Sequence, residues 1–186
     1  AAPANAKLDK KKSATIISFK KDLLAGLSAA GISITASNGA TFSKNVLRFP
    51  VSGVGDGYVA HSGCVTFSNS ATSLEVCDPM IGYPTDVPSK TWDLSVTYAG
   101  NPGLPLMTLQ HVKANENCSV KKDKKTKKFM KKTNTNIQSD VHLTTNETVL
   151  SVLNGTFGPV FTADMGLGQS RTTLVDQYNS KKKQKC

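Results

Sequence analysis

The sequence has few charged residues, few aromatic residues and no long apolar run. Charged residues make up 19% and aromatic residues 6% of its 186 residues, and Ser, Thr, Asn and Gly are abundant. This shortage of charge disfavours a helical bundle and favours a β-rich secreted domain. Because no stretch of about 18 apolar residues occurs, the sequence predicts no transmembrane helix. The length suits one domain with loose ends.

Catalytic motifs are also missing. The sequence contains no Gly-x-Ser-x-Gly, no His-Glu-x-x-His and no phosphate-binding loop, which argues against a hydrolase or a nucleotide-binding enzyme. Gly166-Leu167-Gly168 lacks the third glycine of a dinucleotide-binding turn, so we interpret it as an ordinary turn. The sequence leaves open whether the chain is an enzyme. Any redox activity would need a bound cofactor, because disulfide-bonded cysteines cannot turn over unaided.

Positive charge is concentrated in three short lysine-rich segments. Residues 1–21 carry a net charge of +5, residues 121–132 carry +7 and residues 181–186 carry +4, whereas the two intervening segments each carry −3. Blocks of like charge repel, stay solvated and often serve as interaction tails. The excess charge of the chain therefore belongs to its appendages and not to its expected core.

The two ends of the chain predict its domain boundaries. Ala4-Asn5-Ala6 has the small-x-small form that precedes a signal-peptidase cleavage site, so we interpret residues 1–12 as a disordered export stub and basic tail. Residues 13–180 would then form a single β-sandwich domain, followed by a basic C-terminal tail at 181–186. We expect a secreted or cell-surface, extracellular protein.

The most basic segment is expected within a lysine-rich loop over residues 113–136. Lysine clusters attract phosphates, sulfates and acidic surfaces. The loop could be a mobile solvated hairpin tip, or it could contact polyanions, such as anionic cell-envelope or host polymers, or a membrane surface. Specific nucleic-acid recognition is disfavoured, because residues 121–132 contain no Arg and one aromatic residue, Phe129. The lysines concerned are Lys121, Lys122, Lys124, Lys125, Lys127, Lys128, Lys131 and Lys132.

The four cysteines predict a disulfide framework, which is typical of an oxidising compartment. A hairpin with a four-residue loop at 69–72 would place Cys64 directly opposite Cys77, at a separation that a disulfide can span. By elimination Cys118 would pair with Cys186, although four cysteines allow three connectivities and the sequence does not choose among them. A structural zinc site is disfavoured, because no close Cys pair occurs.

Short alternating segments such as Thr91–Tyr98, separated by turn signals, predict many short strands. A helix is expected over residues 19–30 with Ser18 as its cap, and a second one after the capping box that runs from Thr144 to Glu147. The fold class is therefore mainly β: an immunoglobulin-like antiparallel β-sandwich, or a partly closed barrel, with two short flanking helices.

Among residues able to hold a cofactor, His61 falls on the apolar face of its predicted strand, across from Met80. An imidazole beside a thioether is typical of haem or copper ligand pairs, yet opposed strand neighbours lie too close to hold a haem iron from opposite sides. A hydrogen-bonded structural histidine is the competing interpretation. The other candidate haem contacts are Tyr58 and His111, followed by Tyr83, Tyr98 and His142.

Two stretches resemble HtaA-type haem-binding domains of actinobacteria. Phe49-Pro50-Val51-Ser52-Gly53, followed by His61-Ser62-Gly63-Cys64-Val65-Thr66-Phe67, is similar to their "FP-x-x-G … HSG-G-[LV]-T-F" pattern. Val141-His142-Leu143-Thr144, continuing through Leu153-Asn154 to Phe161, resembles their closing segment. The similarity covers most of residues 20–175.

The resemblance implies a β-rich exported domain that binds haem through tyrosine and histidine, similar also to small secreted antioxidant proteins. The expected first helix has no tyrosine where those domains use one for iron, and Cys64 replaces a glycine of the motif, so His61 is the ligand carried over. The resulting hypothesis is a secreted bacterial protein that binds haem or a similar tetrapyrrole, in haem handling or antioxidant protection. The alternative is a non-catalytic surface adhesion or polyanion-binding module of immunoglobulin-like fold.

Overall fold

A computed structural model describes residues 7–82 and 91–186. Strands dominate it, which confirms the mainly β class. The strands are β1 (Lys7–Leu8), β2 (Ala14–Phe19), β3 (Ser33–Ser37), β4 (Thr41–Ser43), β5 (Val46–Gly55), β6 (Tyr58–His61), β7 (Cys64–Ser68), β8 (Ser73–Gly82), β9 (Trp92–Tyr98), β10 (Asn101–Lys122), β11 (Phe129–Leu143) and β12 (Gly166–Ser180). The two helices are α1 (Lys21–Ala29) and α2 (Glu147–Phe157).

The strands form one sheet that closes into a barrel. Eight strands follow one another in the order β8-β6-β5-β2-β12-β11-β10-β9, and β9 pairs again with β8 to complete the circle. β7 and β3 extend from β8 as a flap, while β1 and β4 add short pairs to β12 and β5. The described strands therefore form a closed barrel and not the two facing sheets of an immunoglobulin-like sandwich. The strand pattern alone did not distinguish the two folds, because both bury alternate residues.

A break between β6 and β7 changes the register predicted for the hairpin. Cys64 lies opposite Cys77, as predicted, but Met80 lies opposite Ala60 and not opposite His61. Gly63 and Asp78 both have positive φ at this break, and the Asp78 amide donates to the Gly63 carbonyl. A Cβ at residue 63 would lie 2.7 Å from Ala40, so only glycine fits the bend.

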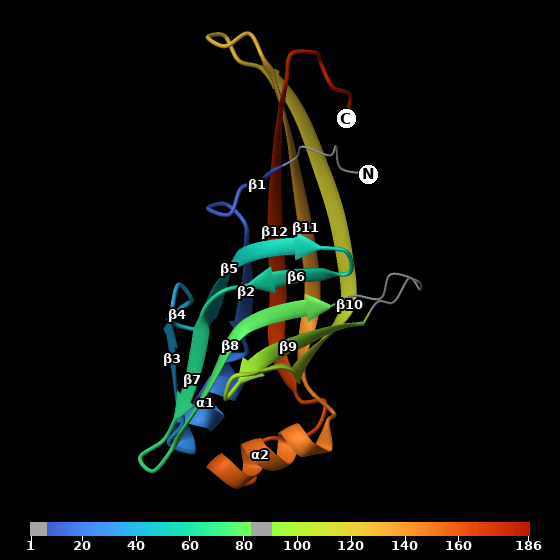
Figure 1. The fold of residues 1–186 in the computed structure, drawn as a ribbon. Coiled ribbons are helices and arrows are strands. Elements are labelled where there is room, and N and C mark those ends of the chain that lie inside the picture. The colour runs from blue at the N-terminus through green and yellow to red at the C-terminus, as the bar shows by residue number, and fades with distance from the viewer. Residues whose placement is uncertain (1–6, 83–90) are drawn as a thin grey trace.

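The lysine-rich segment expected as a loop at 113–136 is a long β-ribbon. β10 and β11 pair continuously from Lys113–Gln138 to Lys122–Phe129, and β12 pairs with β11 along the same length. Together the three strands project well beyond the barrel (Figure 1). The segment between β10 and β11 lacks strand structure at 123–128. Sequence reasoning missed the ribbon because its lysines and asparagines have low strand propensity, which cross-strand pairing overrides.

The described parts of both expected tails contact the rest of the chain. The expected disordered segment 1–12 includes β1, and residues 1–6 lie outside the described residues. The basic C-terminal segment after β12 folds back along the ribbon, where Cys186 is joined to Cys118 and the Lys131 ammonium donates to the Lys185 carbonyl. Both disulfides inferred from the sequence, Cys64–Cys77 and Cys118–Cys186, are thus present.

The helices lie at the end of the barrel opposite the ribbon (Figure 1). α1 starts at Lys21 without a side-chain cap, so Ser18 is not its cap but a residue of β2. The α2 cap is Asn146, whose side chain accepts from the Val149 amide, two residues after the predicted Thr144. Neither helix has the length and apolar character needed to span a membrane.

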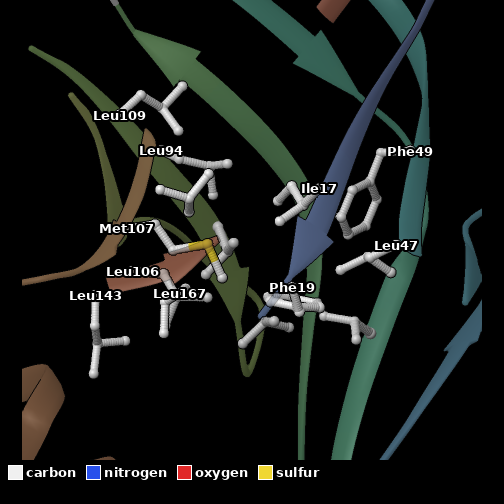
Figure 2. Packing of buried hydrophobic residues seen from close by; sticks show 14 of the residues in the cluster. Ile17, Phe19, Leu47, Phe49, Leu94, Leu106, Met107, Leu109, Leu143 and Leu167 are labelled. Carbon is white, nitrogen blue, oxygen red and sulfur yellow. The ribbon is translucent and has the colours of Figure 1, made fainter. Parts of the chain in front are cut away.

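The barrel is filled by alternate residues of its strands. Figure 2 shows Ile17, Phe19, Leu47 and Phe49 from β2 and β5 on one side, facing leucines and Met107 from β9, β10 and β12. These side chains are at most 6% exposed. Because inward residues alternate with outward ones, the positions between them point to the outer surface of the barrel. That alternation places the candidate functional site on the outer surface of the barrel.

Candidate functional site

The structure places His61 inside the barrel. The side chain is 4% exposed; its Nδ1 lies 2.9 Å from the Pro79 carbonyl oxygen, and its Nε2 lies 2.7 Å from Thr15 Oγ1. A carbonyl only accepts, so Nδ1 carries the proton, and Nε2 accepts from the Thr15 hydroxyl. Thr15 in turn pairs with Thr172. Both ring nitrogens are therefore engaged, and His61 fits the structural interpretation and not that of an iron ligand.

Burial also holds His61 in its neutral form. Desolvation lowers the pKa of His61 below its usual value, and the hydrogen bond to the Pro79 carbonyl opposes that shift only in part. A neutral imidazole is the form that can accept from Thr15. The residue thus belongs to a polar chain that crosses the barrel interior.

Tyr58 and Met80 lie on the outer surface, away from His61. Both are substantially exposed, and they come from the paired strands β6 and β8. Tyr58 lies across Gly55, whose bare backbone leaves room for the ring. The predicted trio of Tyr58, His61 and Met80 therefore does not converge on one site. Tyr98 packs against the core, and Tyr83 lies outside the described residues.

His111 and His142 are the predicted histidines that line sizeable cavities. A groove of about 460 Å³ runs over the outer surface of β10, β11, β12 and β2. It continues into a second hollow of about 500 Å³, with which it shares Ser18, Asp140 and Gln169. We call the joined hollows the histidine groove. Its charged and histidine side chains are Lys20, His111, Lys113, Asp140, His142 and Arg171.

A β-bulge turns His111 towards this surface. Between the pairs Gln110–Asp140 and Lys113–Gln138, β10 has two residues where β11 has one. His111 has a φ of 53°, a left-handed conformation that is uncommon for residues other than glycine. Bulges re-aim side chains and are frequent next to functional sites. The sequence alone did not reveal this bulge, because nothing in Gln110–Lys113 marks an inserted residue.

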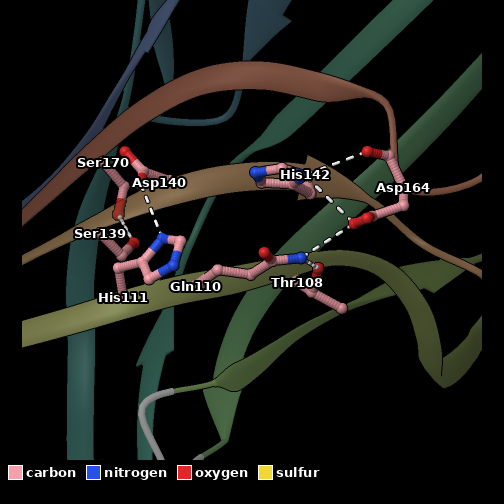
Figure 3. Close-up of polar contacts among 8 residues, drawn as sticks. All are labelled: Thr108, Gln110, His111, Ser139, Asp140, His142, Asp164 and Ser170. Carbon is pink, nitrogen blue, oxygen red and sulfur yellow. Dashed lines mark hydrogen bonds and ion pairs between the residues drawn. The ribbon is translucent and has the colours of Figure 1, made fainter.

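Each histidine of the groove is oriented by an aspartate (Figure 3). His111 Nδ1 lies 3.0 Å from Asp140 Oδ2, and His142 Nδ1 lies 3.1 Å from Asp164 Oδ1 and 3.0 Å from the Asp164 carbonyl oxygen. These acceptors place the proton of each neutral ring on Nδ1, so Nε2 keeps its lone pair. Among the described residues, Nε2 of either ring has no hydrogen-bond partner. A histidine held through one nitrogen by a carboxylate is typical of metal ligands.

The side chains of Lys20 and His142 both lie close to the backbone of Gly166. A Cβ at Gly166 would lie 2.6 Å from the Lys20 ammonium and 3.9 Å from His142 Cε1. Gly166 therefore leaves open the space into which both side chains extend. Lys20 is the residue before α1, where the chain leaves β2. The arrangement brings a cation within reach of a potential imidazole ligand.

The histidine groove contains more positive than negative charge. Lys20, Lys113 and Arg171 line it, against the carboxylate of Asp140. Such a surface can bind the carboxylates of an anionic ligand while an imidazole nitrogen binds a metal centre. Haem presents both groups, its propionates and its iron, so the donors present fit that group. Ile16 supplies apolar side-chain surface at the floor, whereas Phe19 and Val141 line the groove only at the backbone, because their side chains are buried in the core.

A second cavity fits a tetrapyrrole less well. It lies among apolar residues near α1 and α2, including Leu27, Leu153 and Phe161, and has a volume of about 40 Å³. That space holds about one water-sized group. Its lining contains no His, Tyr, Asp or Glu side chain. It is a small void of the core, and the Met107 thioether is the one side chain of its lining able to bind iron.

Sequence reasoning identified His111 and His142 but missed their partners. Asp140 is two residues from His142 on β11 and therefore points to the same face, a signal that alternation could have given. Lys20, Asp164 and Arg171 are each more than 20 residues from either histidine in the sequence. Their juxtaposition depends on the pairing of β2, β11 and β12, which no local pattern reveals.

Comparison with known proteins shows the fold. No family model matches the sequence, and no curated protein matches it. Among solved structures, the haem-binding protein HtaB from Corynebacterium glutamicum is similar, with a TM-score of 0.56 and 11% identity over 94% of this chain and 98% of that chain. The C-terminal domain of HtaA from the same organism has a TM-score of 0.54 and 12% identity over 91% of this chain and 99% of that one. The resemblance inferred from the sequence is thus confirmed at the level of fold.

Proposed function

We propose that this protein binds haem or a related tetrapyrrole in the histidine groove. One observation carries the proposal: His111 and His142 line the joined hollows, and each has its Nδ1 held by an aspartate. The shared fold with two proteins from Corynebacterium glutamicum, one named a haem-binding protein, supports the choice of ligand.

The groove residues divide the recognition between them. His142 is the better candidate for the iron, because it is less exposed than His111 and is held by two acceptors of Asp164. His111 would contact the ligand at the other end of the groove. Lys20, Lys113 and Arg171 would bind the propionates through charge-assisted hydrogen bonds. Bound haem supplies the redox-active iron, while the protein orients it and neutralises its carboxylates.

We also propose that the protein works outside the cytoplasm. All four cysteines of the sequence are paired in disulfides. Disulfides persist in oxidising compartments and are rare in the cytosol of mesophiles. A haem-binding protein in that location would hold haem away from other reactants, which suits either haem handling or antioxidant protection.

Titration with haemin, followed at the Soret band, tests the ligand. The native protein should shift the band, and His142→Ala should weaken the affinity about tenfold or more. Tyr58→Phe is the matched control on the opposite outer surface and should leave the titration unchanged. Absence of any band shift with the native protein, or unchanged binding by the double variant His111→Ala/His142→Ala, would refute the site.

A second titration separates the two kinds of recognition. Iron-free protoporphyrin keeps the propionates but cannot coordinate an imidazole. Quenching of its fluorescence should weaken with Lys20→Gln/Arg171→Gln and persist with His142→Ala. Equal losses with both variants would mean that His142 acts by shaping the groove and not by binding iron.

The protective role has its own measurement. Peroxidation of lipid by haemin in solution should slow when the native protein is added in excess, because bound haem is withdrawn from the lipid. Protein carrying His142→Ala should protect less, in proportion to its lower affinity. Equal protection by both proteins would remove haem binding as the cause.

A further inference from the structure

The ribbon formed by β10, β11 and β12 has two chemically different faces. Residues that pair directly across neighbouring strands share a face, and the register is continuous over 113–122, 129–138 and 171–180. One face continues the outer surface of the barrel and the other continues its interior. We call them the outer and the inner ribbon face.

Charge is segregated between these faces. The outer ribbon face carries the cations Lys113, Lys121, Lys132 and Arg171, and no Asp or Glu occurs at its positions in the three segments. Both acidic residues of these segments, Glu116 and Asp176, fall on the inner ribbon face. Asp9 reaches the outer side from the turn after β1. Its carboxylate accepts a hydrogen bond from the Gln177 amide and forms an ion pair with Lys12.

Uncharged polar side chains separate the outer cations. They supply amide and hydroxyl groups able to donate and accept: Asn115, Asn117, Ser119, Asn134, Asn136, Gln138, Thr173, Gln177 and Asn179. Val175 and Met130 are the apolar members, and Val175 is buried. Alternating cations and amides match a ligand in which acidic groups alternate with hydroxyls.

The inner ribbon face is partly covered by the protein itself. The disulfide from Cys118 brings the C-terminal segment onto this face, and the Lys131 ammonium donates a hydrogen bond to the Lys185 carbonyl. The Lys122 ammonium lies 5.5 Å from the centre of the Phe129 ring on the same face. The outer ribbon face therefore offers the cations that are not turned towards neighbouring parts of the chain.

From these observations we propose that the outer ribbon face binds a linear anionic polysaccharide, lying along the strands. Lys113 and Lys121 are eight residues apart on β10, so the cations extend over about 26 Å at the usual strand rise. That length suits an oligosaccharide segment and exceeds a single sugar. The proposed polysaccharide site shares Lys113 and Arg171 with the histidine groove, but Lys121 and Lys132 lie outside the groove, so variants at these two lysines test the polysaccharide separately from haem.

The composition of the face favours a polysaccharide over a lipid bilayer. Peripheral membrane helices and segments insert apolar side chains below the headgroups. The large apolar side chains that are exposed among the described residues are Val54, Tyr58, Met80 and Val152, none of which belongs to the ribbon. Without an apolar wedge, binding would be electrostatic and directional through amides.

A matched pair of double variants tests the face. Lys121→Gln/Lys132→Gln removes two charges from the outer ribbon face, and Lys122→Gln/Lys131→Gln removes two from the inner one, on the same two strands. With a size-defined heparin oligosaccharide as the probe, the outer variant should lose affinity about tenfold. The inner variant should stay within about twofold of the native protein, because exposed charges that do not touch the ligand contribute little.

The salt dependence adds a second readout. Removing a lysine that contacts an acidic group should reduce the slope of log K against log salt by about 1. The outer variant should thus lose about 2 from the slope, and the inner variant close to none. Equal losses from both variants would mean binding by net charge alone and would overturn the proposal, as would native protein that fails to bind.

Two further probes decide the chemistry of the partner. Dextran, which has the hydroxyls but no charge, should not bind. Vesicles rich in anionic lipid should bind more weakly than heparin and without the preference for the outer face. Vesicle binding that depends on Lys121 and Lys132 as strongly as heparin binding does would assign the face to membranes and refute the polysaccharide. Haemin titration of the outer variant should be unchanged, which separates this outcome from failure of the haem proposal.

Discussion

Thr15 and His61 are 46 residues apart in the sequence, yet the Thr15 hydroxyl oxygen lies 2.7 Å from His61 Nε2 inside the barrel. Thr15 belongs to β2 and His61 to β6, which are both paired with β5 but not with each other. The hydrogen bond thus crosses the interior behind β5. It satisfies a polar ring that would otherwise be buried without a partner.

Replacing Thr15 with valine should destabilise the protein. The change keeps the shape of the side chain but leaves His61 Nε2 and the Thr172 hydroxyl without their shared partner. A buried polar group left unsatisfied costs about 1–3 kcal/mol. Urea unfolding should show a loss of that size, whereas Thr35→Val on the exposed strand β3 should show little. A Thr15→Val protein as stable as the native one would contradict this account of the interior.

Stability should decline as the pH falls below the ordinary pKa of histidine, in part because of His61. Burial lowers the pKa of His61 in the folded protein, so on acidification His61 is protonated in the unfolded chain while it is still neutral in the folded one. More protons bound by the unfolded state mean that stability rises with pH and is lost on acidification. Per proton the slope cannot exceed about 1.4 kcal/mol per pH unit. In His61→Gln, the fall between pH 7 and pH 5.5 should be shallower; an unchanged slope would contradict the assignment.

Asp176 should lower stability at neutral pH. Burial, and next the nearby Glu116, raise the pKa of Asp176 in the folded protein. A raised carboxyl pKa stabilises the fold at acidic pH, and that contribution is lost as the pH rises through the folded pKa. Asp176→Asn should therefore raise the free energy of unfolding at pH 7, and with it the melting temperature. The gain should be only about a few tenths of a kcal/mol, because the side chain is partly exposed. Asp93→Asn on the surface of β9 is the control, and a lower melting temperature for Asp176→Asn would oppose the prediction.

The two disulfides should contribute unequally. Cys118 and Cys186 are 68 residues apart, and Cys64 and Cys77 are 13 apart. In the chain-entropy model these loops correspond to about 4 and about 3 kcal/mol. Cys118→Ser/Cys186→Ser should also release the basic C-terminal segment, so limited proteolysis should trim it before the barrel is cut. If that segment resists trypsin equally with and without the disulfide, other contacts hold it to the ribbon.

Some features of the molecule followed from local sequence. Alternation of apolar and polar residues predicted strands such as β9, and the hairpin numbering placed Cys64 opposite Cys77. The lysine blocks were evident from composition. These features depend on residues close together in the chain, where side-chain period and turn length determine the outcome.

Other features depended on how distant strands meet. The sequence placed His61 beside Met80, but the bend at Gly63 and Asp78 shifts β6 by one residue and turns His61 to Thr15. The bulge at His111, the approach of Lys20 to His142 and the uncharged or basic outer ribbon face arise from pairing between segments up to about 150 residues apart. Alternation tells which residues share a face of one strand, but only the closure of the barrel decides which strands become neighbours, because many pairings bury the same apolar residues equally well.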